Sequence, residues 1–122
     1  MSKIRWGIVG AGRIAHTFAQ AMPATDNGVV QAVAARSGAS AHAFADQYGI
    51  ASAHEGYEAL FADPDVDAVY IATPHTSHLQ NASDALQRGK AVLCEKPVTV
   101  NAAECQQLIE TAGESSTYLM EA

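Results

Sequence analysis

Short apolar runs that alternate with segments of helical spacing restrict the fold of this sequence more than any other feature. Most of the runs are almost continuously apolar, which is typical of strands buried on both faces of a sheet. Turn-forming residues stand between most segments, and Pro23 is predicted to stop the first helix. The predicted strands are residues 4–9, 29–35, 51–54, 68–72, 91–94 and 117–120, and the predicted helices are residues 13–22, 39–48, 57–62, 76–87 and 102–112.

This alternation predicts an α/β fold, because parallel strands need a crossover between them and such crossovers are right-handed. We therefore predict a doubly wound parallel sheet of the Rossmann type, with about six strands and helices on both faces. The 122 residues, of which 48% are hydrophobic, suffice for one compact domain and not for two. Residues 1–122 are accordingly predicted to form a single domain.

Composition excludes several classes of partner. The formal net charge of −6 argues against non-specific nucleic-acid binding, which depends on clusters of Lys and Arg. The longest apolar stretches are only a few residues long, so none is predicted to cross a membrane. Cys94 and Cys105 either form a disulfide or remain free, and free thiols fit a reducing compartment. We expect a soluble, cytoplasmic protein.

Residues 10–15 read Gly-Ala-Gly-Arg-Ile-Ala, directly after the first predicted strand and at the start of the first predicted helix. This is a G-x-G-x-x-A version of the dinucleotide-binding turn. Gly10 permits the tight turn, and Gly12 lacks a side chain that would collide with a pyrophosphate. The free N–H groups at the helix start then face the anion. A glycine turn without a ligand is the alternative, but the context favours cofactor contacts by Gly10, Gly12, Arg13 and Ile14.

The residues after the second predicted strand bear on the choice of nucleotide. NAD-selective domains usually place a carboxylate there to bond the ribose 2′-hydroxyl. Here the sequence continues with Arg36 and Ser37 and has no carboxylate. Arg36 offers a fork of donors to a 2′-phosphate, and Ser37 adds a hydroxyl. Arg36 as a solvated strand end is the alternative; NADP is predicted, with NAD as second choice.

Two other patterns resemble metal sites without meeting the requirements for one. His75 and His78 are spaced for one helical face, but no third ligand is close in the sequence. Asp63, Asp65 and Asp67 look like the start of a calcium loop, yet the sixth position lacks glycine and the twelfth lacks glutamate. We therefore predict no metal site, and the absence of a base beside either cysteine argues against a thiol nucleophile.

Three features together resemble the Gfo/Idh/MocA family, which is named for glucose–fructose oxidoreductase and inositol dehydrogenase. They are the glycine turn, Ala72-Thr73-Pro74 followed by His78, and Cys94-Glu95-Lys96-Pro97. Gly89-Lys90 and the closing Tyr-Leu-Met-Glu-Ala are most similar to its dihydrodiol-dehydrogenase-like branch. The resemblance covers the chain from residue 4 onward. His75 departs from it, because the family commonly has asparagine at this position.

The resemblance implies roles for individual residues. It places Lys96 beside the nicotinamide and the reacting carbon, where the lysine bonds a substrate hydroxyl and assists proton transfer. It also implies that the Lys96–Pro97 peptide bond is cis and that Glu95 holds ribose or backbone groups. The residues expected on the nicotinamide-ribose side of the cofactor are Ala72, Thr73, Pro74, His78, Glu95, Lys96 and Pro97.

The resemblance further implies an NADP-dependent oxidoreductase that transfers hydride to or from a hydroxyl or carbonyl carbon of a sugar, polyol or diol. Members of the family carry a second, C-terminal α/β domain that completes the substrate site, and residues 1–122 do not contain it. We therefore expect this chain to bind nucleotide with little turnover, and to meet its small-molecule substrate only together with that domain. A stand-alone nucleotide-binding module, or one that self-associates as a homo-oligomer, is the alternative.

Overall fold

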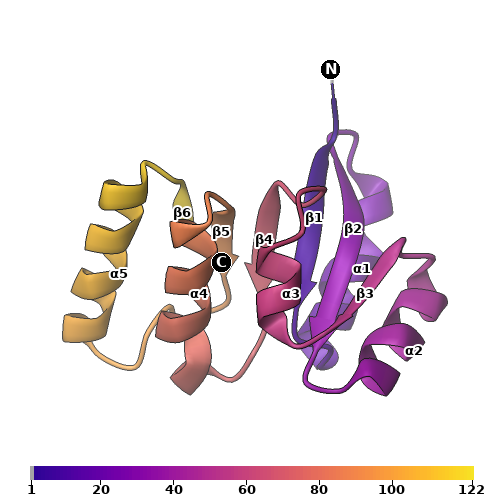
Figure 1. Cartoon of the computed structure of the whole chain (residues 1–122), viewed down its shortest axis with the longest axis horizontal. Coiled ribbons are helices and arrows are strands. Elements are labelled where there is room, and N and C mark those ends of the chain that lie inside the picture. Colours follow the sequence, from indigo (N-terminus) through magenta and orange to yellow (C-terminus); the bar gives the residue numbers. More distant parts are fainter. Residues whose placement is uncertain (1) are drawn as a thin grey trace.

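The computed structural model describes residues 2–122 and contains one six-stranded sheet (Figure 1). Every strand pairing is parallel, and the strand order is β3-β2-β1-β4-β5-β6. The predicted doubly wound Rossmann-type sheet is therefore confirmed. The strands are β1 (Ile4–Val9), β2 (Gly28–Ala35), β3 (Ser52–Glu55), β4 (Ala68–Ile71), β5 (Ala91–Cys94) and β6 (Leu119–Glu121).

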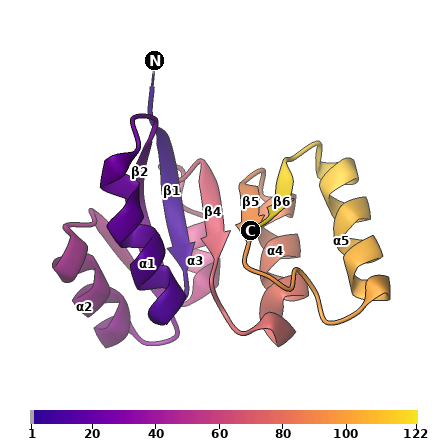
Figure 2. The same ribbon diagram turned by 180° about the vertical axis from the view of Figure 1, so that it is seen from behind.

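Helices cover both faces of this sheet (Figures 1 and 2). One apolar cluster packs Ala15 of α1 (Arg13–Ala21) and Phe44 of α2 (Gly38–Tyr48) against Ile8 of β1. A second cluster packs the helices of the other face against Val9, the next residue of the same strand. Successive residues of β1 thus enter opposite layers, as the strand period requires. The helices are α1 (Arg13–Ala21), α2 (Gly38–Tyr48), α3 (Tyr57–Phe61), α4 (His78–Gln87) and α5 (Ala102–Ser115).

The helix ends differ most from the prediction at three places. Pro23 does not end the helical segment, which continues after α1 as a 3₁₀ turn over Met22–Ala24. Proline is tolerated there because it lies in the first turn. A second 3₁₀ turn, His75–Ser77, precedes α4, so the α-helix begins at His78 and not at residue 76. Helix α5 runs past the predicted end at residue 112, because Ser116, with φ of 51°, ends it in the left-handed conformation.

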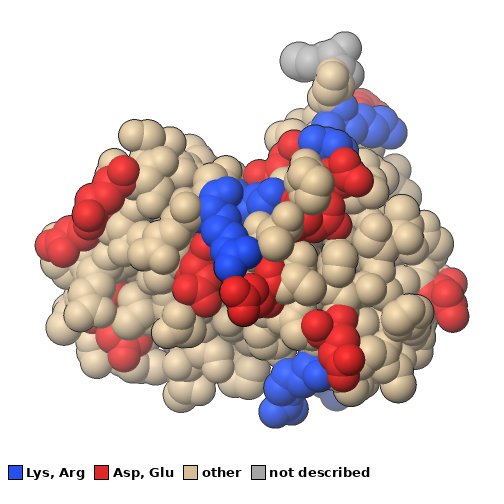
Figure 3. Space-filling model, viewed as in Figure 1, with Lys and Arg blue, Asp and Glu red and all other residues tan. Residues whose placement is uncertain are grey.

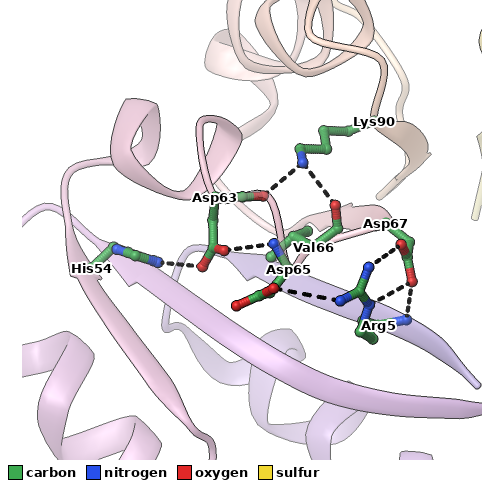
Figure 4. A network of polar contacts seen from close by, with 7 residues as sticks. All are labelled: Arg5, His54, Asp63, Asp65, Val66, Asp67 and Lys90. Carbon is green, nitrogen blue, oxygen red and sulfur yellow. Dashed lines mark hydrogen bonds and ion pairs between the residues drawn. The ribbon is translucent and has the colours of Figure 1, made fainter.

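Polar side chains near the amino ends of β1, β4 and β5 form a paired cluster with His54 of the edge strand β3, called here the amino-edge network (Figure 4). The Lys90 ammonium, which precedes β5, donates to the carbonyl oxygens of Asp63 and Val66 at 2.7 Å each. Arg5 donates to Asp67 through Nε at 3.1 Å and Nη2 at 3.0 Å, which joins β1 to the turn before β4. The members of the network are Arg5, His54, Asp63, Asp65, Asp67 and Lys90.

None of the helices within residues 2–122 is long and apolar enough to cross a membrane. On the face drawn in Figure 3, the few Lys and Arg side chains mostly lie next to Asp or Glu, without an extended basic patch. Within the same described residues, no cluster of three or more His, Cys, Asp or Glu is suited to hold a metal ion.

Candidate functional site: a cleft at the carboxyl edge of the sheet

A cleft of about 820 Å³ opens at the carboxyl ends of β1, β2 and β4. The strand order reverses between β1 and β4, which is where open α/β sheets bind ligands. Its volume lies within the range of small-molecule sites, about 300–1,000 Å³. The lining residues are Gly10, Ala11, Gly12, Ala35, Arg36, Ser37, Ser40, Tyr57, Ala72, Thr73, Pro74 and Ser77.

The structure gives different reasons for a glycine at each of the two predicted turn positions. Gly10 has φ of +101°, and a Cβ there would lie 3.2 Å from the backbone carbon and oxygen of Ala72. The tight turn itself therefore requires Gly10. Gly12 has ordinary extended backbone angles, and a Cβ there would meet no atom within 4 Å. The protein's own packing does not require a glycine at position 12, but a ligand backbone approaching through that open space would.

Helix α1 presents its N-terminus to the same cleft. Gly12 is the N-cap residue, it makes no side-chain cap, and the first turn contains no acidic residue. The N–H groups of the first turn are thus free to bind an anion, and the helix dipole favours negative charge at this end. The residues present fit the pyrophosphate of a dinucleotide.

Arg36 and Ser37 are exposed on the wall beyond β2, next to the N-terminus of α2. Ser37 caps that helix, because its Oγ accepts a hydrogen bond of 3.1 Å from the Ser40 backbone N–H. The two hydroxyls also lie 2.9 Å apart in a hydrogen bond. One guanidinium and two hydroxyls therefore line this end of the cleft, and no carboxylate is among the lining residues.

Side chains of α4 hold the segment after β4 in place. Thr73 Oγ1 accepts a hydrogen bond of 3.0 Å from Asn81 Nδ2, and the Thr73 carbonyl oxygen lies 3.0 Å from His78 Nε2. The other ring nitrogen, Nδ1, lies 2.7 Å from the Pro97 carbonyl oxygen. With 1% of its surface exposed, His78 lies beneath the cleft and does not line it. It links the segments that follow β4 and β5.

Lys96 follows β5 and is exposed. The Lys96–Pro97 peptide bond is cis, as the resemblance implies. The preceding residue, Glu95, accepts a hydrogen bond from the Tyr70 hydroxyl and donates its backbone N–H to Ile71. Among residues 2–122, no side chain forms a hydrogen bond or ion pair with the Lys96 ammonium.

The predicted site residues divide between the cleft and its surroundings. Those in the lining are Gly10, Gly12, Arg36, Ser37, Ala72, Thr73 and Pro74. Those outside the lining are Arg13, Ile14, His78, Glu95, Lys96 and Pro97. Sequence reasoning missed Ser40. Its spacing of three residues from Ser37, which is typical of a helix N-cap contact, could have indicated it. Sequence reasoning also missed Tyr57 and Asn81, for which the sequence offers no sign, because tertiary contacts alone bring them here.

The buried thiol of Cys94 does not have the character of a nucleophile. Cys94 is buried and free, and burial raises the pKa of its thiol to about 12, with a further contribution from the carboxylates of Glu121 and Glu95. The thiol therefore stays protonated, and it donates weakly to the Val98 carbonyl at 3.8 Å. Cys105 is also free.

Residues 4–122 match the profile of the family described as "Oxidoreductase family, NAD-binding Rossmann fold", GFO_IDH_MocA. The chain belongs to the Gfo/Idh/MocA oxidoreductase family. It matches the NAD-binding Rossmann fold of that family, as the motifs predict. The match begins in β1 and includes the glycine turn and the Glu95-Lys96-Pro97 segment.

Curated relatives within this family confirm the predicted branch. Trans-1,2-dihydrobenzene-1,2-diol dehydrogenase of Xenopus tropicalis is 44% identical over 121 residues, which cover 97% of this chain and 36% of the relative. The Homo sapiens enzyme of the same name is 43% identical over 122 residues, covering 98% and 36%. The chain therefore spans little more than a third of the length of these relatives.

Solved structures of similar proteins share the fold closely. A 3-ketoreductase from Actinomadura kijaniata, in complex with NADP and TDP-benzene, has a TM-score of 0.93 at 36% identity, covering 98% of this chain and 37% of that one. An NAD binding oxidoreductase from Klebsiella pneumoniae has a TM-score of 0.94 at 28% identity, covering 99% and 34%.

Proposed function

We propose that the carboxyl-edge cleft of this Gfo/Idh/MocA domain binds NADP in preference to NAD. The observation that carries the proposal is the wall beyond β2, where Arg36, Ser37 and Ser40 line the cleft and no carboxylate does. A guanidinium fork pairs with a phosphate, whereas a carboxylate there would repel it. The NADP bound by the related 3-ketoreductase supports the same choice.

The glycine turn then takes the pyrophosphate at the N-terminus of α1. Open space at Gly12 lets the phosphates approach the backbone, and Arg13 and Ile14 contribute first-turn N–H groups. The segment after β4 lies toward the nicotinamide-ribose side, where its backbone is held by α4. The cofactor contacts proposed there are Ala72, Thr73, Pro74, His78, Glu95 and Pro97.

Lys96 is proposed as the catalytic residue. When bound, the reduced nicotinamide supplies a hydride to a carbonyl carbon. The Lys96 ammonium donates a hydrogen bond to the carbonyl oxygen, polarises it, and gives up a proton as that oxygen becomes a hydroxyl. Because the ammonium is exposed and unpaired among residues 2–122, it is available to a substrate oxygen at this end of the sheet.

The substrate class proposed is a sugar, polyol or diol, from the resemblance to the family and by analogy with the diol dehydrogenases among the relatives. A further domain of the kind their greater length implies would complete the substrate site, and the isolated chain would bind nucleotide with little turnover. Robust hydride transfer by purified residues 1–122 would contradict this. A cytoplasmic location is part of the proposal and is supported by the two free thiols.

Calorimetric titration with NADPH and NADH tests the cofactor choice. Wild type should bind NADPH at least about tenfold more tightly, and Arg36→Ala should remove most of that difference. Arg88→Ala is the matched control, because Arg88 pairs with Glu58 and lies outside the cleft lining. Equal affinity of wild type for the two cofactors would contradict the NADP assignment.

Self-association without catalysis is a second candidate, and the edge strand β6 favours it. Tyr118 is 64% exposed and Met120 48% exposed beside a strand that pairs on one side only. Such exposed apolar side chains on an open edge attract a partner, including a second copy of the chain. Light scattering distinguishes the cases, because a monodisperse monomer at high concentration would contradict self-association.

A further inference from the structure

The hydroxyl of Tyr70 reaches from the interior of the sheet to the residue before Lys96. It donates a hydrogen bond of 2.5 Å to Glu95 Oε2, and 3% of the Tyr70 surface is exposed. Burial raises the pKa of Tyr70 above its ordinary value, and the hydrogen bond and negative charge of Glu95 raise it further. The phenol therefore remains a donor throughout the physiological pH range.

Strand register explains why these two side chains meet. Tyr70 in β4 lies opposite Leu93 in β5, and side chains two residues apart on a strand share a face. Glu95, two residues beyond Leu93, consequently emerges on the face that carries Tyr70. Its backbone N–H donates to the Ile71 carbonyl at 3.0 Å, which continues the β4–β5 ladder to the residue adjoining Lys96.

The phenol ring of Tyr70 is itself held rigidly. It stacks on Phe18 of α1 with centroids 4.2 Å apart and planes within 9° of parallel. Phe18 in turn meets Trp6 edge-on at 5.4 Å. This aromatic column joins the helix that follows the glycine turn to the carboxylate of Glu95. Aromatic pairs of this kind restrict the ring positions as well as burying area.

The segment after β5 has other anchors that do not depend on Tyr70. The Pro97 carbonyl faces the His78 ring, and the Val98 N–H donates to Glu121 at 2.9 Å. Loss of the Tyr70 hydroxyl would therefore leave the segment attached but would release the Glu95 carboxylate. A released carboxylate can swing toward the neighbouring Lys96 ammonium and compete for it.

We propose that Tyr70 is a positioning residue, which fixes the Glu95 carboxylate and thereby keeps Lys96, beside the cleft, in binding geometry. The inference rests on the proposed NADP site. It concerns only the nicotinamide half, because β5 lies three strand spacings from β2 in the order β2-β1-β4-β5. At strand spacings of 4.7–4.9 Å, that separation is roughly 14 Å.

The test compares two ligands that share the adenosine 2′-phosphate. NADPH and adenosine 2′,5′-bisphosphate are titrated by calorimetry into wild type, Tyr70→Phe, Glu95→Gln and the double variant. Tyr70→Phe should bind NADPH roughly tenfold more weakly, because the released Glu95 carboxylate competes for the Lys96 ammonium, and should bind the bisphosphate with unchanged affinity. The double variant should be no weaker than the weaker single variant, since both act through one contact.

Tyr118→Phe is the matched control, because it removes a hydroxyl from an exposed ring and should alter neither affinity. Unchanged NADPH affinity in Tyr70→Phe, an equal loss for both ligands, or additive losses in the double variant would overturn the positioning role. Failure of wild type to bind either ligand would instead overturn the proposed NADP site, and the positioning role with it.

Discussion

The two edges of the sheet use charged groups in opposite ways. At the amino edge, Lys90, Arg5 and the aspartates of the amino-edge network are bonded to one another or to backbone carbonyls. At the carboxyl edge, Arg36 and Lys96 are exposed, and no partner for either is found within residues 2–122. Groups that are already paired stabilise the fold, whereas unpaired donors beside a cleft are available to a ligand.

This difference predicts that substitutions at one edge change stability and at the other change binding. The largest effect is expected from Lys90→Met, because Lys90 is 9% exposed and its ammonium donates to two carbonyl oxygens. We expect a loss of about 3 kcal/mol in the free energy of unfolding, measured in urea, with unchanged NADPH affinity. Lys3→Met, at an exposed position, is the control. A stability loss below about 0.5 kcal/mol would show that the buried ammonium is dispensable.

Gly12→Ser tests the carboxyl edge. Serine is a favoured N-cap and its Cβ meets no protein atom within 4 Å, so stability should hold or rise slightly. The side chain occupies the space assigned to the pyrophosphate, so NADPH affinity should fall at least about tenfold. Gly10→Ala is the contrasting variant, because φ of +101° and the contact with Ala72 should make it unstable. If Gly12→Ser bound NADPH with full affinity, this would contradict the assignment of the pyrophosphate to the glycine turn.

The smallest effect concerns acid pH. The hydrogen bond from Arg5 holds the pKa of Asp67 below its ordinary value. Burial alone would raise the pKa of Asp63, but hydrogen bonds from His54 and from the Asp65 backbone outweigh it. Because these folded-state pKa values are depressed, the unfolded chain takes up protons first as the pH falls. The contribution of Asp67 and Asp63 to the free energy of unfolding is therefore complete above about pH 4 and is lost below it.

Asp67→Asn should make the free energy of unfolding less dependent on pH below about 4. The change should stay under about 1 kcal/mol, since the pair with Arg5 is half-exposed and screened by solvent. Asp26→Asn in an exposed turn is the control. An unaltered pH profile for Asp67→Asn, measured by thermal unfolding between pH 2 and pH 5, would exclude a contribution from this pair.

The sequence predicted the fold and seven residues of the cleft lining, because both depend largely on local pattern. Apolar runs, turn residues and the glycine turn with Gly10 and Gly12 act over a few residues. Helix ends were less predictable, since Pro23 and Ser116 end or extend helices through backbone geometry that the residue type permits without requiring.

Contacts between distant segments were beyond prediction. Tyr57 reaches the cleft only because β3 pairs with β2, and Tyr70 meets Glu95 across 25 residues through the β4–β5 register. His78 was assigned a cofactor contact from the family pattern, and the structure instead places it between two loop carbonyls. Direct contact between its side chain and the cofactor stays a prediction.

The most direct test of the contrast between the edges is a backbone amide NMR titration of residues 1–122 with NADPH. The carboxyl-edge site predicts shifts concentrated at residues 10–15, 36–40 and 72–77, with residues 63–67 and Lys90 unaffected. Shifts centred on the amino-edge network, or no shifts at the glycine turn at saturating NADPH, would contradict it.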